Sequence, residues 1–182
     1  MPVHPLEWSV HCATARLLAY GVRCHQNTYR QNGNLVSVDL DSLPVTLTDI
    51  ERAAELLEGV IERTPVAHSR ALSQRLGSEV FFKCENLQRA GSFKVRGAYV
   101  RMAKLSEEEK KRGVVAASAG NHAQGVALAA DRLGIKARIY MPLGAALPKI
   151  TATRDHGAEV ELHGVTVDEA LAEAKRYAEE TG

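Results

Sequence analysis

The sequence predicts an α/β fold in which open parallel or mixed sheets are flanked by helices. Three observations support this class. From residue 113 onward, short apolar runs of strand length alternate with longer stretches of helical periodicity. Such alternation is typical of βαβ units around a buried parallel sheet. Capping residues precede several of the expected helices, and glycines follow their ends.

The region between residues 46 and 112 indicates three helices and one strand. Thr48 and Glu51 have the T-x-x-E spacing of a capping box, and Ser92 and Ser106 are candidate N-caps. The expected elements are a helix from Thr48 through Ile61, an aromatic and β-branched strand over 79–83, a helix from Ser92 toward Leu105 and a short helix over 107–112.

The remaining residues predict three further strands and three further helices. Thr166 and Glu169 form a second capping box, which starts the last helix. The other expected elements are strands over 114–118, 137–141 and 158–162 and helices over 121–133 and 148–156. Ligands of open α/β sheets collect at the carboxyl ends of strands. Segments 89–94 and 118–122 are predicted to lie at such places.

Composition narrows the function classes. Lys and Arg number 23 against 22 for Asp and Glu, which gives a net charge of +1. Without a clustered basic surface we expect neither nucleic acid nor a membrane as partner. The longest apolar runs are far too short for a membrane span. The three cysteines have neither disulfide-framework nor metal-ligand spacing, so we expect a cytoplasmic protein without a metal.

The first 44 residues lack sustained periodicity, and no signal-peptide pattern is present. We expect a disordered N-terminal extension or a misassigned start. A transit peptide remains an alternative, because Arg16 and Arg23 lie in an acid-poor region.

The sequence contains no complete nucleotide-binding or hydrolase motif. The sequence contains no G-x-G, and Gly120 and Gly125 have P-loop separation without the lysine that should follow. Residues 116–120 differ from a nucleophile elbow by one position, and Asp155 and His163 follow in hydrolase order. The missing first glycine makes a hydrolase a weak alternative.

Lys94 is the more informative residue. A cation is disfavoured at the positive end of a helix, and Lys94 follows closely on the expected start at Ser92. Held between Phe93 and Val95, its amine would have reason to lose its proton, and a neutral amine is what Schiff-base chemistry needs. Taken alone, an exposed lysine on an amphipathic helix is the simpler interpretation. The surrounding residues decide between the two.

Two long segments resemble one enzyme family. Residues 83–98 (KCENLQRAGSFKVRGA) resemble the cofactor-lysine motif of the threonine dehydratases, which are threonine/serine ammonia-lyases of pyridoxal-phosphate fold type II. Residues 118–125 (SAGNHAQG) resemble the asparagine loop of the same family. The similarity runs from about residue 45 to 182. Cysteine synthases of this fold carry different versions of both motifs.

The resemblance implies pyridoxal 5′-phosphate as cofactor and a role for each matching residue. Lys94 would bind the cofactor covalently, Phe93 would border its ring and Asn121 would hydrogen-bond its 3′ oxygen. The substrate carboxylate would be received by Ser118, Gly120, Asn121 and His122. A helix start attracts an anion on physical grounds as well. His122 alone fits a solvent-facing residue of the first helical turn equally well.

The implied reaction is a β-elimination that converts L-threonine to 2-oxobutanoate and ammonia, with L-serine to pyruvate as a side activity. Lys94 would remove the Cα proton. The main alternative is a serine racemase, but racemases of this fold use a serine at the second position of the asparagine loop. Here that residue is Ala119. We further expect a homo-oligomer at full length and a place in amino-acid metabolism, including isoleucine biosynthesis.

The resemblance also implies a domain division. Residues 45–112 would begin the larger, cofactor-binding domain, and residues 113–182 would form the smaller βα domain. Family members continue with a glycine-rich phosphate loop. We therefore expect a truncated chain in which the rest of the larger domain is missing, inactive on its own. A catalytically incompetent fragment is the non-enzymatic alternative.

Overall fold

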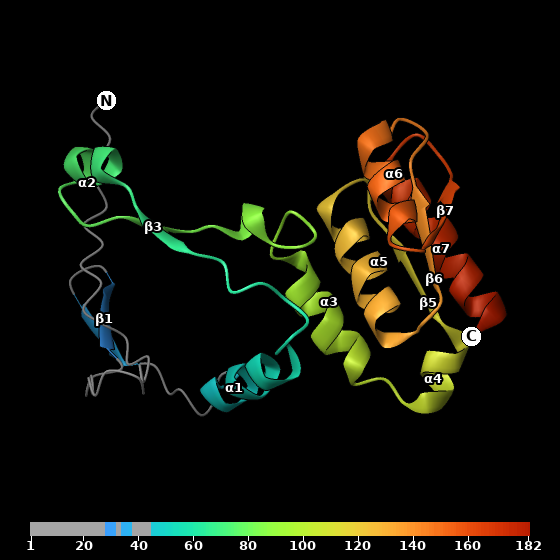
Figure 1. Ribbon diagram of the computed structural model, residues 1–182, viewed down its shortest axis with the longest axis horizontal. Helices are drawn as coiled ribbons and strands as arrows, with labels where there is room; N and C mark the ends of the chain where they lie inside the picture. Colours follow the sequence, from blue (N-terminus) through green and yellow to red (C-terminus); the bar gives the residue numbers. More distant parts are fainter. Residues whose placement is uncertain (1–27, 32–33, 38–44) are drawn as a thin grey trace. The chain divides into compact units, whose positions relative to one another are not determined.

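The computed structural model describes residues 28–31, 34–37 and 45–182. The chain divides between Ala54 and Glu55 into two compact units, which are described separately. In the first, β1 (Thr28–Gln31) and β2 (Asn34–Ser37) form an antiparallel pair (Figure 1). The rest of the expected N-terminal extension, residues 1–27, 32–33 and 38–44, lies outside the described residues.

The cap of helix α1 (Leu47–Leu56) is Thr46, two residues before the predicted cap Thr48. The Thr46 hydroxyl accepts the Asp49 backbone N–H at 3.2 Å, and the Asp49 carboxylate accepts the Thr46 N–H at 2.9 Å. The capping box predicted at Thr48 is therefore wrong, because an equivalent pair lies just upstream. Turns follow directly after α1, so the helix does not reach Ile61.

The second unit contains a small antiparallel pair and a larger parallel sheet with its helices. Its elements are β3 (Val66–His68), α2 (Arg70–Leu76), β4 (Phe81–Lys83), the 3₁₀ turn η2 (Glu85–Leu87), α3 (Lys94–Ala103), α4 (Glu107–Arg112), β5 (Val114–Ala117), α5 (Asn121–Leu133), β6 (Ala137–Met141), α6 (Leu147–Asp155), β7 (Glu159–Leu162) and α7 (Val167–Thr181). The predicted strand over 79–83 is confirmed in shorter form as β4, and β3 and α2 were not predicted.

The sequence placed the larger sheet correctly. Strands β5, β6 and β7 pair in that order and are all parallel. Every strand and helix predicted after residue 106 is present, and each differs from its expected bounds by at most one residue at either end. The predicted N-cap Ser106 and the predicted capping box at Thr166 are both found, and Ser106 also forms a capping box with Glu109. The α/β prediction is confirmed.

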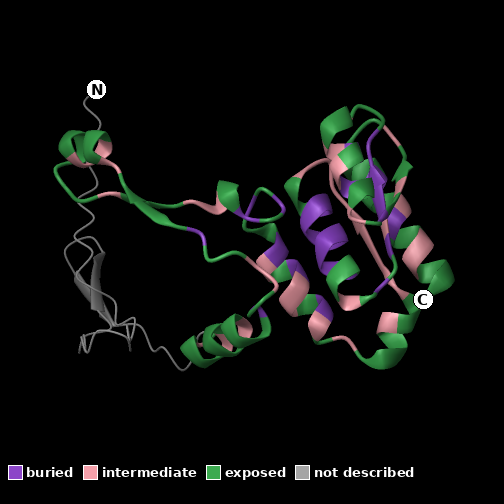
Figure 2. Cartoon of the chain, viewed as in Figure 1, coloured by how far each residue is buried: buried purple, intermediate pink, exposed green. Residues whose placement is uncertain are grey.

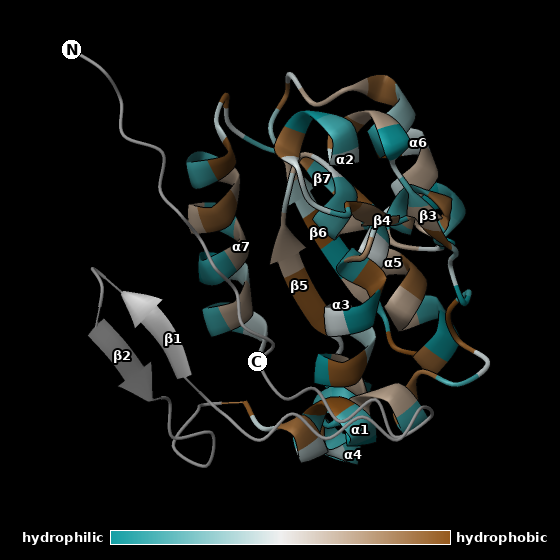
Figure 3. Cartoon of the chain, turned by 90° about the vertical axis from the view of Figure 1, so that its left-hand side faces the viewer, coloured by the Kyte–Doolittle hydropathy of each residue, from teal (hydrophilic) through white to brown (hydrophobic). Residues whose placement is uncertain are grey.

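The central strand β6 decides how the layers pack. Ile139 and Met141 are fully buried in the cluster that includes α5, whereas Tyr140 between them packs against Ala170 of α7. Successive side chains of a strand point to opposite faces. Helices α5 and α6 therefore cover one face of the sheet and α7 the other, as Figures 1 and 3 show.

Helix α5 is buried on nearly all sides. Every residue from Ala123 to Ala130 is buried, which Figure 2 shows as the main buried helix of this region. A helix without a solvent-facing stripe must be covered from several directions. Here the sheet covers one side and α3 packs closely on another. The small alanines and Gly125 allow this close packing.

A polar cluster fixes the segment before α3. Arg96 donates two hydrogen bonds of 2.8 Å to the Glu85 carboxylate, and the Thr64 hydroxyl donates a third at 2.6 Å. Mainly through the Arg96 hydrogen bonds, the pKa of Glu85 falls from its ordinary 4.5 to about 2. The carboxylate thus ties η2 to α3 from one side, and to the chain around residue 64 from the other.

We predict that Glu85→Gln destabilises the fold by about 1–3 kcal/mol at pH 7, because two charge-assisted hydrogen bonds are lost. A lowered folded-state pKa adds stability above pH 4.5 that disappears as the pH falls toward 2. The difference between wild type and variant should therefore shrink as the pH falls from 4.5 to about 2 in urea unfolding.

Glu107→Gln is the matched control. Glu107 pairs with Lys110 at 2.8 Å on an exposed surface, and such a pair contributes little to stability because solvent screens it. If both variants unfolded alike at pH 7, or if the Glu85→Gln difference did not change with pH, the stabilising role of the cluster would be refuted.

Candidate functional site

The loop between β5 and α5 lies at the carboxyl end of the parallel sheet, as predicted. Ser118 extends the ladder of β5, because its N–H donates to the Tyr140 carbonyl at 3.1 Å. The Ser118 hydroxyl accepts the Gly120 N–H at 3.2 Å. Of the four residues expected to bind a carboxylate, Gly120 therefore already uses its N–H inside the loop, while the Ser118 hydroxyl hydrogen remains available.

The start of α5 is left without a cap. Gly120 is the N-cap residue and has no side chain, and the first turn contains no acidic residue. Within the described part of the chain, the backbone N–H groups of Asn121 and His122 have no hydrogen-bond partner. Unpaired amides at the positive end of a 13-residue helix form a favourable position for an anion.

Lys94 is the first residue of α3 and is exposed. The predicted N-cap Ser92 is wrong, because Phe93 occupies the N-cap position; the Ser92 hydroxyl only accepts the Lys94 N–H at 3.4 Å. The Lys94 ammonium lies 4.9 Å from the centroid of the Phe93 ring, itself 57% exposed. Val95 is fully buried, so the expected enclosure of Lys94 between its two neighbours is not found.

The backbones of α3 and α5 lie very close together at Gly125. A Cβ atom at this position would lie 2.9 Å from both the Lys94 carbonyl carbon and the Val95 nitrogen. Gly125 follows Asn121 by four residues, so the two share one face of α5. Lys94 thus lies beside the first turn of α5, although 27 positions separate it from Asn121 in the sequence.

The imidazole of His122 also lies close enough to Lys94 to be affected by its charge. Partial burial lowers the pKa of its imidazole below the ordinary 6.5, and the positive charge of Lys94 lowers it further. A neutral imidazole at this position can accept a hydrogen bond on one ring nitrogen and donate from the other.

A second lysine reaches the site from α6. The Lys149 ammonium donates a 2.6 Å hydrogen bond to the Asn121 side-chain oxygen. Sequence reasoning missed this residue, because the contact spans 28 residues and depends on packing between α5 and α6. The one available signal was a cation in the first turn of a helix, directly after Pro148.

Five helix starts of the second unit fall into two groups, whereas α2 has a side-chain cap from Ser69 without an acid in its first turn. Helices α4 and α7 begin with complete capping boxes, in which Glu109 and Glu169 supply carboxylates. Helices α3, α5 and α6 have no side-chain cap and no acidic residue in the first turn. These three uncapped starts carry Lys94, His122 and Lys149. The site is therefore electropositive, in a way suited to an anionic ligand.

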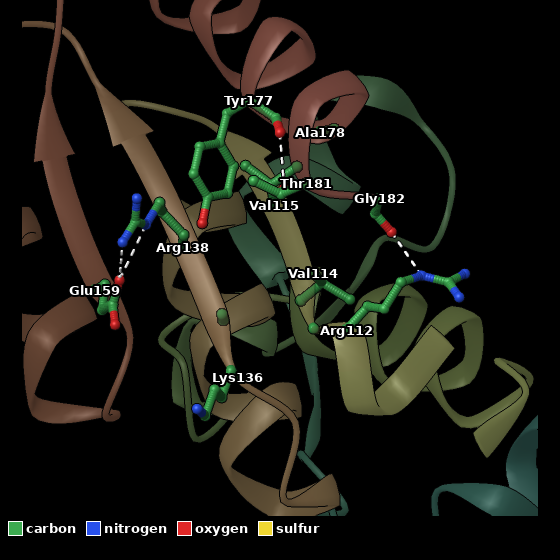
Figure 4. A pocket seen from close by; sticks show the side chains of 12 residues that line it. Arg112, Val114, Val115, Lys136, Arg138, Glu159, Tyr177, Ala178, Thr181 and Gly182 are labelled. Atoms are coloured by element: carbon green, nitrogen blue, oxygen red, sulfur yellow. Dashed lines mark hydrogen bonds and ion pairs between the residues drawn. The ribbon is translucent and has the colours of Figure 1, made fainter. Parts of the chain in front are cut away.

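A separate cavity lies at the opposite end of the parallel sheet. A cavity of about 390 Å³ is lined by the amino ends of β5 and β6 and by the end of α7. Two of its three cations have partners: Arg138 pairs with Glu159 at 2.6 Å, and Arg112 donates to the Gly182 carbonyl at 2.7 Å (Figure 4). None of the predicted site residues lines it, so it is separate from the candidate site.

The described residues show neither a metal site nor a membrane-spanning helix. No group of three or more His, Cys, Asp or Glu residues gathers there in a way that could hold a metal ion. None of the described helices has both the length and the apolar character needed to cross a membrane.

Comparison with known proteins gives a consistent result. Residues 57–182 match the family model described as pyridoxal-phosphate dependent enzyme. The L-threonine ammonia-lyase of Thermotoga maritima is 58% identical over 138 residues, which cover 76% of this chain and 34% of the relative. The chain thus spans about a third of this curated relative's length.

Solved structures agree. The processed threonine deaminase isoform 2 of Solanum lycopersicum aligns with a TM-score of 0.63 and 42% identity, over 72% of this chain and 39% of its own. The maize serine racemase aligns with a TM-score of 0.69 and 36% identity, over 81% and 43%.

We predict that Gly125→Ala destabilises the protein by about 1–3 kcal/mol, because the new methyl group meets backbone atoms that cannot easily move. Gly97→Ala on α3 is the matched control. Nothing lies within 4 Å of the added Cβ, so the better helix propensity of alanine should stabilise by about 0.5–1 kcal/mol.

Urea unfolding measures both variants, and amide NMR shifts at Lys94 and Val95 should change in the Gly125 variant alone. Equal stability of the two variants would contradict the close helix contact described here.

Proposed function

Because the chain belongs to the pyridoxal-phosphate dependent enzyme family, we propose that it carries the cofactor lysine and the substrate loop of an ammonia-lyase. This enzyme would convert L-threonine to 2-oxobutanoate and ammonia, with L-serine to pyruvate as a second activity. The relatives named threonine ammonia-lyase and threonine deaminase support this choice. One structural observation carries the proposal, namely an exposed lysine amine beside an uncapped helix start.

The residues present fit pyridoxal phosphate. The cofactor requires a primary amine, an aromatic or apolar neighbour for its ring and donors for its oxygens. Lys94 supplies the amine and Phe93 the exposed ring next to it. The Asn121 side-chain oxygen accepts a hydrogen bond from Lys149, whereas the side-chain nitrogen has no partner among the described residues. Asn121 would thus donate to the 3′ oxygen of the cofactor.

Bound pyridoxal phosphate supplies an electron sink that stabilises negative charge at the Cα of an attached amino acid. The proton on that Cα must be removed by a base of this chain. Lys94 is the proposed base, because its amine is exposed and lies beside the start of α5. A neutral lysine amine can accept the proton and return it later.

The substrate carboxylate would lie at the start of α5. The unpaired N–H groups of Asn121 and His122 and the Ser118 hydroxyl form its proposed receptor, and Gly120 would join if its N–H left the Ser118 oxygen. A carboxylate there gains from both the hydrogen bonds and the helix dipole. The neutral state favoured for His122 lets it bond the substrate without adding charge.

Elimination is favoured over racemisation by Ala119. Racemisation requires a second acid on the face of the substrate opposite the base, and the methyl group of Ala119 has no proton to give. Although maize serine racemase has a similar fold, the fold alone does not decide the chemistry.

We also infer that residues 45–112 belong to the larger domain and residues 113–182 to the smaller one, and that the enzyme acts in the cytoplasm as a homo-oligomer. The proposed pathway is amino-acid metabolism, including isoleucine biosynthesis. Cysteines without a disulfide-framework spacing support a reducing compartment.

We predict that Lys94→Ala removes the visible absorption of lysine-bound pyridoxal phosphate and lowers 2-oxobutanoate formation by on the order of 10³-fold or more. The measurement uses this chain and a chimera in which residues 45–182 replace the matching segment of the Thermotoga maritima relative. Lys104→Ala, at the other end of α3, is the control for unspecific reaction with exposed lysines. Normal turnover of the Lys94 variant in the chimera would disprove the assignment.

We predict that Ala119→Ser raises the fraction of D-serine formed from L-serine, because the new hydroxyl can protonate the opposite face. One hydroxyl should produce only a partial shift, about tenfold at most in the D-serine yield. Chiral chromatography of chimera reactions measures the products, and Ala117→Ser at the end of β5 is the control. Abundant D-serine from the unaltered loop would argue against the ammonia-lyase and for the racemase.

A further inference from the structure

The contact between Lys149 and Asn121 has a chemical direction. An ammonium group has only donors, so it can bind the oxygen of an amide but not its nitrogen. The 2.6 Å hydrogen bond from Lys149 therefore fixes which end of the Asn121 amide faces α6. The –NH₂ end must then point away from Lys149, and it donates no hydrogen bond to the described residues.

The position of Lys149 is unfavourable for α6 itself. Lys149 is the third residue of this nine-residue helix, whose first turn contains no acidic side chain and whose N-cap Ala146 offers no side-chain oxygen. A cation in the first turn is disfavoured by the positive end of the helix dipole. The hydrogen bond to Asn121 is the favourable interaction of Lys149 at this position, where α6 itself disfavours a cation.

We propose that Lys149 is a positioning residue, which holds the Asn121 amide so that its –NH₂ group is presented to the cofactor oxygen. This inference rests on the proposed function, since it is Asn121 that touches the cofactor. Lys149 acts through Asn121 and contacts neither cofactor nor substrate. Without Lys149 the amide can rotate, and either end can face the cofactor.

A simple charge effect is the competing explanation. A lysine near an electropositive site also attracts the anionic cofactor at long range, whatever its hydrogen bond. The two explanations differ in one respect. A positioning role disappears when Asn121 is absent, whereas a charge effect does not. Non-additivity of two substitutions is the appropriate measure of such dependence.

The first experiment needs no cofactor. In the ¹⁵N-labelled chain, the Asn121 side-chain amide is assigned by its loss in Asn121→Ala. We expect Lys149→Met to shift this resonance pair and to speed rotation of the amide, because methionine keeps the length but not the donors. Lys149→Arg should retain the wild-type pattern. Lys136→Met, an exposed lysine at the opposite end of the sheet, should leave it unchanged.

The second experiment is a pyridoxal phosphate titration of the chain and the chimera, with Lys94→Ala as background. Lys149→Met and Asn121→Ala should each weaken binding about tenfold, since each loses the same charge-assisted arrangement. The double variant should bind no more weakly than Asn121→Ala alone. Lys149→Arg should restore most of the affinity.

The outcomes separate the two levels of the argument. Unchanged Asn121 amide resonances in Lys149→Met would overturn the contact, and additive losses in the titration would overturn the positioning role. If neither the chain nor the chimera bound pyridoxal phosphate at Lys94, the proposed function would fall. The inference would then fall with it, even where the resonances confirmed the contact.

Discussion

The close approach of α3 and α5 at Gly125 is the constraint on which the candidate site depends. Only a residue without a side chain lets the α5 backbone lie against Lys94 and Val95. Burial of Val95 in this contact leaves Lys94 facing outward at the start of α3. On the other side of the helix, Arg96 binds Glu85. Val95 and Arg96 therefore fix the first turn of α3 from two directions.

Most of the parallel sheet and its helices could be predicted because their signals are local. Glycines with positive φ end α4 and α5 at Gly113 and Gly134, and side-chain caps start α4 and α7. The errors also have local causes. Two overlapping T-x-x-acid pairs compete at the start of α1, and the hydrogen bonds form between Thr46 and Asp49. The short strand β3 has three exposed residues, so no apolar alternation marked it.

The site was predictable as two segments, but their relation was not. Lys94 and the loop from Ser118 to His122 were found through resemblance and through the rule for strand ends. Lys149 was missed because its hydrogen bond to Asn121 exists only once α5 and α6 are packed. The exposure of Lys94 was also missed, since sequence neighbours do not reveal which side chain of a helix start turns inward.

The uncapped starts of α3, α5 and α6 have a further consequence for the evolution and engineering of this chain. Stabilising a protein commonly begins by giving each helix a Ser or Asp cap and an acid in its first turn. At Phe93, Gly120 or Ala146, such a change would offer the amides an internal oxygen in place of a ligand. Thermostability and ligand affinity would then be in direct competition at these three positions. Selection for heat resistance should consequently improve every other helix end of the chain first.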